Sequence, residues 1–364
     1  MKTIFLAKRL RPSTYAIHAV LTASMLISGC ATRPEVPGRP LTQSAPATDP
    51  LPQPDTPEQV ALKTRIGLQD RLYRVAAPLL VNNTELCKNN ARKLLGFTAK
   101  NKYSYGPEFV DAAERSFGLG EQLRILAVLN GGSAAQAGLK PGDVLLNVED
   151  QPMPQGPNAE RVAAASLGPI VNSRSAVRIA LQRGRETKAI NVALTPACAY
   201  NIELGNADNV NAYTDGPRIM LTRGMMNFAR TDAELAYVIA REMAHAALGH
   251  PGRLRMSATL GGIIDNLIRV RPDLSTMSGT SGVKPFAQDV DAAADTLALY
   301  FLARAGYDID AAPRFWQRLA MQYPATVLNG YTAIHPATNY RLDIIGQIVT
   351  TIKTKKSAGE ILMP

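Results

Sequence analysis

Residues 232–250 place three ionisable side chains on a stretch that is otherwise almost wholly apolar. At helical spacing this stretch leaves no polar face, which is typical of a helix buried inside a fold. Arg241, Glu242 and His245 would then lie in the core. Because burying ionisable groups is costly unless they have partners, the sequence predicts partner groups elsewhere in the chain. The apolar positions are Leu235, Val238, Ile239, Met243 and Leu248.

Arg241 and His245 have the spacing of two metal ligands. Side chains at i and i+4 lie on one helix face, one turn apart. The run Arg-Glu-Met-Ala-His resembles the H-E-x-x-H motif of zinc peptidases, in which the glutamate takes a proton from metal-bound water. Glu242 and His245 match this motif. Arg241 stands where the first histidine belongs, and a guanidinium, with no free lone pair, cannot ligate zinc.

A second set of residues lies downstream, where Asp291-Ala-Ala-Ala-Asp295 leads into a predicted helix that ends in Ala-Gly-Tyr-Asp308. This resembles the E-x-x-A-D motif of the zinc peptidase family typified by HtpX, the CAAX prenyl endopeptidase and BepA. The family's glutamate ligand falls on Asp291, and the aspartate that supports its ligands falls on Asp295. Two further blocks fit the family in order, Asn211–Gly224 and His335–Arg341.

The resemblance covers roughly residues 200–350 and implies zinc, peptide-bond hydrolysis and Glu242 as the catalytic base. His245 and Asp291 would be metal ligands. His335 is either a substitute ligand or a packing residue. A structural zinc site is worth about 10–16 kcal/mol over four ligands, so losing one ligand costs about 3 kcal/mol, or ~100-fold in affinity. The sequence therefore predicts impaired zinc binding.

Arg241 itself suggests what replaces the metal. The planar guanidinium suits paired contacts with carboxylates, so we expect it to bind Asp291, Glu242 or Asp295. Three functions remain open. The first is a peptidase-like domain that binds or scaffolds polypeptides with impaired or no proteolysis. The second is an active zinc metalloendopeptidase that acts on envelope proteins through His245, Asp291 and His335. The third is a pure interaction module.

Residues 1–29 are predicted to be a lipoprotein signal peptide. A basic start precedes an apolar stretch at 16–27, which ends in Leu26-Ile-Ser-Gly-Cys30, similar to the lipobox of bacterial lipoproteins. Cys30 would carry the lipid. Ala31 at the next position favours the outer membrane, facing the periplasm. Residues 30–58 are rich in Pro, Ser, Thr and Gln and are predicted to be a disordered tether.

The cysteine count and the net charge bear on a disulfide and on the class of partner. With Cys30 lipidated, Cys87 and Cys198 remain, and an oxidising envelope favours a disulfide between them over two separate buried thiols. The net charge is +10, of which the signal contributes four positive residues and no acids. The chain has no basic run interleaved with aromatic residues, so no nucleic-acid partner is predicted.

Residues 101–196 are predicted to form a PDZ domain. The run 130–148 resembles the G-S-x-A-x-x-A-G-L-x-x-G-D-x-I segment of bacterial PDZ domains, and alternation around Arg183-Gly-Arg185 predicts a hairpin. PDZ domains bind peptide termini by strand addition, beside a loop of the G-L-G-F kind. The nearest candidate loop is Gly118-Leu-Gly-Glu121, whose glutamate would face the ligand carboxylate. Peptide binding and a spacer role both remain open.

The remaining segments complete an α+β expectation, in which the PDZ domain is followed by a mainly helical, gluzincin-like metallopeptidase domain at 197–364. Residues 59–100 are predicted to be mostly helical, with an extended piece at 78–81, and to pack on the PDZ domain. The Gly, Ser and Thr of 275–283 suggest that residues 251–285 form a cover over the site.

Overall fold

The computed structural model describes residues 54–87, 90–250, 286–324 and 335–364. The predicted signal, the predicted lipidation site Cys30, most of the predicted tether and the suggested cover at 251–285 lie outside these ranges. Within them, the chain from Pro54 to Pro364 forms one unit. Among the described residues, no helix combines the length and hydropathy of a membrane span.

The first element is a long helix, α1 (Pro57–Val81). Thr56 caps its start, with its side chain accepting from the backbone N–H of Gln59. The predicted extended piece at 78–81 is wrong, because the helix continues through Pro78 to its end. Pro78 removes one backbone donor, but Leu79 and Leu80 are buried in the core and hold the last turn in place.

Of residues 59–100, which were predicted to be mostly helical, the part up to Val81 lies in helix α1. Residues 91–94 and 97–100 are strands, β1 (Ala91–Leu94) and β2 (Phe97–Lys100). Each pairs with a strand distant in sequence: β1 with β8 (Thr195–Cys198), and β2 with β3 (Arg124–Val128). Tertiary pairing therefore decides this segment, which local spacing could not reveal.

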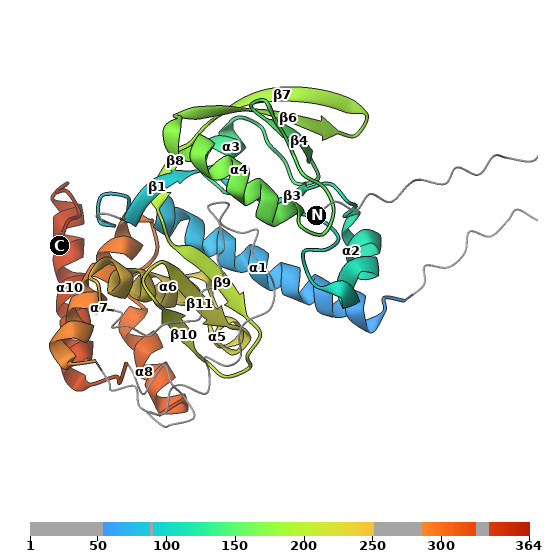
Figure 1. The fold of residues 1–364 in the computed structure, drawn as a ribbon. Coiled ribbons are helices and arrows are strands. Elements are labelled where there is room, and N and C mark those ends of the chain that lie inside the picture. Colours follow the sequence, from blue (N-terminus) through green and yellow to red (C-terminus); the bar gives the residue numbers. More distant parts are fainter. Residues whose placement is uncertain (1–53, 88–89, 251–285, 325–334) are drawn as a thin grey trace, which may run out of the picture. The chain divides into compact units, whose positions relative to one another are not determined.

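A β-rich region follows, as predicted. Its main sheet has the strand order β2-β3-β4-β6-β7, with β5 beside β4 (Figure 1). The predicted hairpin is confirmed: β6 and β7 pair in continuous antiparallel register from Ala176↔Ala193 to Arg183↔Glu186. Its remaining elements are η2 (Pro107–Phe109), α2 (Val110–Phe117), α3 (Ser133–Gln136), β4 (Val144–Val148), β5 (Gln151–Pro152), α4 (Ala159–Ser173), β6 (Ala176–Arg183) and β7 (Glu186–Ala193).

The mainly helical region carries a small sheet in the order β10-β11-β9, in which β9 is parallel to β11. A disulfide joins Cys87, after α1, to Cys198, at the end of β8. The chain therefore has a mixed α+β fold. The elements of this region are β9 (Asn201–Gly205), β10 (Ala212–Thr214), β11 (Arg218–Thr222), α5 (Arg223–Phe228), α6 (Asp232–Ala247), α7 (Gln288–Arg304), α8 (Ala312–Gln322) and α10 (Asn339–Ser357).

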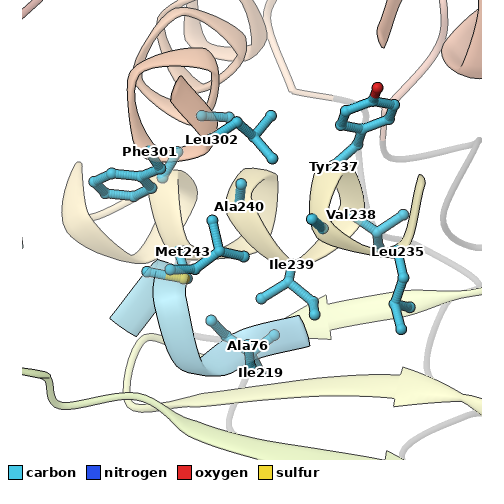
Figure 2. Packing of buried hydrophobic residues seen from close by; sticks show 14 of the residues in the cluster. Ala76, Ile219, Leu235, Tyr237, Val238, Ile239, Ala240, Met243, Phe301 and Leu302 are labelled. Carbon is cyan, nitrogen blue, oxygen red and sulfur yellow. The ribbon is translucent and has the colours of Figure 1, made fainter. Parts of the chain in front are cut away.

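Helix α6 is the centre of the largest hydrophobic core. Figure 2 shows Ile239 pointing toward Ala76 of α1 and Ile219 of β11, while Phe301 and Leu302 of α7 lie on the opposite side of the helix. Every residue of α6 from Leu235 to Ala247 is buried. The helix predicted to lack a polar face is therefore enclosed on all sides, and its ionisable residues must find partners inside the protein.

Candidate functional site

Helices α6 and α7, together with the turn that leads into α10, bring the predicted site residues together. Arg241, Glu242 and His245 project from α6, with at most 1% of each exposed. Asp291 and Asp295 lie on the first turns of α7 and are equally buried. The third contribution is His335, together with Arg341 near the start of α10. Residues separated by almost a hundred positions thus share one buried cluster, as the order of the sequence blocks predicts.

Arg241 occupies the middle of this cluster. Its Nη2 donates to Asp291 Oδ1 at 2.6 Å, and its Nη1 contacts a carboxylate oxygen of Asp295. The guanidinium also lies over the ring of Trp316, with its carbon 5.3 Å from the ring centroid. The expected pairing is therefore observed with two carboxylates of α7. A single cation links α6 to α7 through charge-assisted hydrogen bonds.

A second arginine extends the cluster to α10. Arg341 donates from Nε to Asp295 Oδ2 at 2.9 Å. Its Nη1 donates to the backbone carbonyls of His335 and Pro336 at 3.0 and 2.6 Å. Asp295 is thus shared between two arginines, and Arg341 fixes the turn that presents His335. This contact explains why His335 and Arg341, six residues apart, belong to one sequence motif.

The two imidazoles converge on the same carboxylate oxygen. His335 Nδ1 lies 3.0 Å and His245 Nε2 lies 3.5 Å from Asp291 Oδ1. His335 Nε2 is 3.7 Å from Glu242 Oε1. The ligand atoms of His245, Asp291 and His335 lie within 4.8 Å of one another, so these three side chains are placed to hold a metal ion.

Burial sets the charge of these groups. It raises the pKa of Glu242 to about 8, although the Arg241 charge opposes the rise. It lowers the pKa of His245 to about 4, and that of His335 also well below its usual value. Burial alone would raise the pKa of Asp291, but hydrogen bonds from both histidines and the Arg241 charge together lower it. At neutral pH an ionised Asp291 therefore faces Arg241, while Glu242 and both imidazoles are neutral.

This arrangement does not fit the usual three-ligand zinc site. The first ligand position carries a guanidinium, and the oxygen of Asp291 that faces the histidines already accepts from Arg241 at 2.6 Å. A zinc ion at this carboxylate would lie next to a fixed positive charge, which repels it. Binding by His245, Asp291 and His335 would require Arg241 to leave Asp291.

Aromatic and histidine contacts around the cluster were not apparent from sequence. Phe286 stacks on both His245 and His335, with centroid separations of 4.8 and 5.2 Å. His250 Nδ1 lies 3.1 Å from His245 Nδ1. Helical geometry would turn His250 away from His245, but α6 ends at Ala247 and the following turn brings its ring back. The glycine at 249, with φ of 73°, was the available signal for that turn.

The candidate carboxylate-binding loop of the β-rich region, Gly118–Glu121, follows α2, and its Leu119 is buried in a small separate core with Leu62 and Tyr105. Carboxylate binding by this loop stays a prediction. A second glycine-containing run, Leu95-Gly96-Phe97, leads directly into β2, the end strand of the described sheet. Gly96 has φ of 79°, which favours glycine.

Comparison with known proteins identifies the helical region. Residues 180–349 match the pattern of peptidase family M48. This matched segment is just under half of the chain, and we call it the M48 domain. The match begins within β6 and ends within α10, and it includes all the cluster residues described above. Family M48 enzymes are zinc-dependent, so the cluster of the M48 domain lies where a metal site is expected.

Curated relatives agree with this assignment. The chain is 30% identical over 154 residues to the mitochondrial metalloendopeptidase OMA1 of Arabidopsis thaliana, a match that covers 41% of this chain and 31% of that protein. It is 28% identical over 139 residues to the beta-barrel assembly-enhancing protease of Yersinia pestis, covering 34% and 29%. The chain thus spans about a third of the length of these relatives.

Two solved structures are similar to part of this chain. The HtrA3 PDZ domain bound to a phage-derived ligand is 16% identical and covers 29% of this chain and 88% of that one, with a TM-score of 0.22. The HtrA-type protease AlgW with a decapeptide is 25% identical, covers 29% and 30%, and has the same TM-score of 0.22. The PDZ-like description of the β-rich region rests on its strand order and its hairpin register.

Proposed function

We propose that the M48 domain of this chain binds or scaffolds polypeptides, with zinc-dependent proteolysis impaired or lost. One observation carries the proposal, the position of the Arg241 guanidinium between Asp291 and Asp295. A fixed cation there neutralises the carboxylates that a metal would otherwise need. It also links α6 to α7, so the fold does not depend on an ion to hold these helices together.

Without zinc, the remaining groups lack the means to activate water. A metal lowers the pKa of its bound water from about 15.7 to about 7. Glu242 is the catalytic candidate, and its raised pKa of about 8 leaves it mostly protonated at neutral pH. A protonated carboxyl group cannot accept a proton from water. The chemistry thus favours binding over hydrolysis.

Polypeptides are the partners that this architecture favours. M48 peptidases act on polypeptide chains, and the PDZ-like region offers β2 as an end strand beside Leu95-Gly96-Phe97. An extended peptide can add to such a strand through backbone hydrogen bonds. We place this binding in the bacterial cell envelope, with the chain lipid-anchored at Cys30 and facing the periplasm. Replacing Cys30 with Ala should move the protein from the membrane to the soluble fraction.

The test of the main proposal is proteolysis by the purified full chain. We expect no cleavage of casein above the background of an equal amount of a Glu242→Gln variant. The two preparations should also have the same far-UV circular dichroism, so that a folding defect is excluded. Cleavage by the native chain that disappears in Glu242→Gln would contradict the proposal.

One observation favours a second candidate function, an active metalloendopeptidase. His245, Asp291 and His335 offer one ligand atom each within a small volume, and Glu242 adjoins them. On this alternative, Arg241 would move away from Asp291 when a metal binds. Metal analysis distinguishes the two candidates, because only the second predicts one tightly bound zinc per chain that is lost in a His245→Ala, His335→Ala double variant.

A further inference from the structure

A cleft of about 1060 Å³ lies away from the buried cluster, between α1, the loop at 103–110 and the end of β9. Its lining mixes apolar and aromatic side chains with two arginines. Leu68, Leu204 and Phe109 provide the apolar part, and Arg65 and Arg223 provide the charge. We call it the Arg65 cleft. Neither the predicted site nor the M48 cluster uses any of these side chains.

Arg65 is the unusual group in this cleft. It is half-buried on α1 and donates from Nη1 to the side-chain oxygen of Asn206. Its Nε is buried and has no hydrogen-bond partner among the residues that the structure describes. Burial lowers its pKa, and the nearby charge of Arg223 lowers it further. A buried guanidinium normally has a carboxylate partner, because desolvating its charge is costly.

Tyr105 provides a second donor at this cleft. Its side chain is 2% exposed and lines the same cleft as Arg65. Burial raises its pKa, so the hydroxyl keeps its proton and remains a donor. The unpaired Nε of Arg65 and the hydroxyl of Tyr105 thus border one cleft, where both can donate to an acceptor from outside the chain.

The charges nearby favour an anionic acceptor. Arg223 adds positive potential, although Asp208 already pairs with it at 2.6 and 2.7 Å. Glu108 also lines the cleft but is exposed to solvent. The charge of Glu160 contributes to the raised pKa of Tyr105, and its carboxylate pairs with Lys100 at 3.0 Å. Asn206 offers an oxygen to Arg65 but carries no charge. The guanidinium therefore remains uncompensated within the described part of the chain, and an incoming carboxylate would compensate it.

We propose that the Arg65 cleft binds a carboxylate of a polypeptide, either an acidic side chain or a chain terminus, through Arg65 and the Tyr105 hydroxyl. Apolar side chains beside that carboxylate would contact Leu68, Leu204 and Phe109. The size of the cleft exceeds what a small anion needs and suits several residues of a peptide. This inference rests on the proposed polypeptide binding and narrows it to acidic segments.

Fluorescence polarisation with the full chain tests the inference, using three fluorescein-labelled decapeptides. The first alternates glutamate with leucine and has an amidated end, and the second replaces each glutamate with glutamine. The third is the glutamine peptide with a free carboxyl end. We expect the first or the third to bind at least about tenfold more tightly than the second, as charge-assisted hydrogen bonds imply. Which one binds identifies the source of the carboxylate.

Variants locate the binding. Arg65→Gln should weaken the preferred peptide about tenfold or more, and Tyr105→Phe several-fold. The matched control is Lys63→Gln, on the same helix, because Lys63 pairs with exposed Asp55 and does not line the cleft. Arg65→Gln should also melt at the same or a higher temperature than the native chain, because it removes an uncompensated charge. If the role of Arg65 were purely structural, the Arg65→Gln variant would instead melt at a lower temperature than the native chain.

Two results would overturn the inference. One is equal affinity for all three peptides, including no binding at all. The other is an Arg65→Gln variant that binds like Lys63→Gln. If peptides bind independently of Arg65, polypeptide binding stands and only the role of this cleft fails. A tightly bound zinc would contradict the proposed function and leave the peptide result unaffected.

Discussion

Replacing Arg241 with methionine should strongly destabilise the M48 domain. Methionine keeps most of the volume and the contact with Trp316 but removes the charge. Asp291 then loses its fully buried partner at 2.6 Å, and Asp295 loses one of its two arginines but keeps its pair with Arg341. Breaking a buried pair by removing one partner costs about 3–5 kcal/mol. For a domain of this size, that cost lowers the melting temperature by about 6–20 °C.

The assay is thermal unfolding followed by circular dichroism, with two comparisons. Arg223→Met is the matched control, because its pair with Asp208 is largely exposed and contributes less than about 1 kcal/mol. Adding Asp291→Asn to Arg241→Met should recover part of the lost stability, because it removes the unpaired carboxylate. If the Arg241→Met variant melted at the same temperature as the native chain, the reasoning would be refuted. It would also be refuted if the double variant melted at no higher temperature than the Arg241→Met variant.

Three further predictions follow from other parts of the structure. As pH rises from 5 to 8, the Glu242→Gln variant should become more stable relative to the native chain by about 1.4 kcal/mol per pH unit. The reason is that Glu242 ionises near pH 8 in the folded native chain but near pH 4.5 in the unfolded chain. Paired urea titrations of both proteins at each pH measure this difference in the free energy of unfolding. Replacing both Cys87 and Cys198 with Ala should cost about 5 kcal/mol, because the disulfide closes a loop of 111 residues, and calorimetry with and without reductant measures it. Gly96→Ala should cost about 1–2 kcal/mol in the same urea assay, because φ is 79° there and the new Cβ would lie 3.3 Å from Cβ of Ala134.

Much of the site could be predicted from sequence because its residues fall in ordered blocks. The apolar pattern of 232–250 predicted a buried helix, and the carboxylates of α7 were correctly expected to meet Arg241. The hairpin of β6 and β7 followed from alternation around a glycine turn. In each case, local periodicity or fixed spacing determines which side chains share a face.

The remainder depended on contacts between distant segments. Sequence could not tell which carboxylates Arg241 would choose, because Glu242 adjoins it in the chain while Asp295 lies 54 positions away. Strands β1 and β2 were missed because their partners lie far along the chain. The Arg65 cleft was missed for the same reason, since Arg65, Tyr105 and Arg223 come from three separate segments.

Zinc affinity tests the central claim most directly. Isothermal titration calorimetry would compare the native full chain with an Arg241→His, Asp291→Glu variant, which restores the family's ligands. We predict that the variant binds one zinc at least about 100-fold more tightly than the native chain, in line with about 3 kcal/mol per ligand. A native chain that binds one zinc as tightly as the restored variant would contradict the account, because the guanidinium would then not exclude the metal.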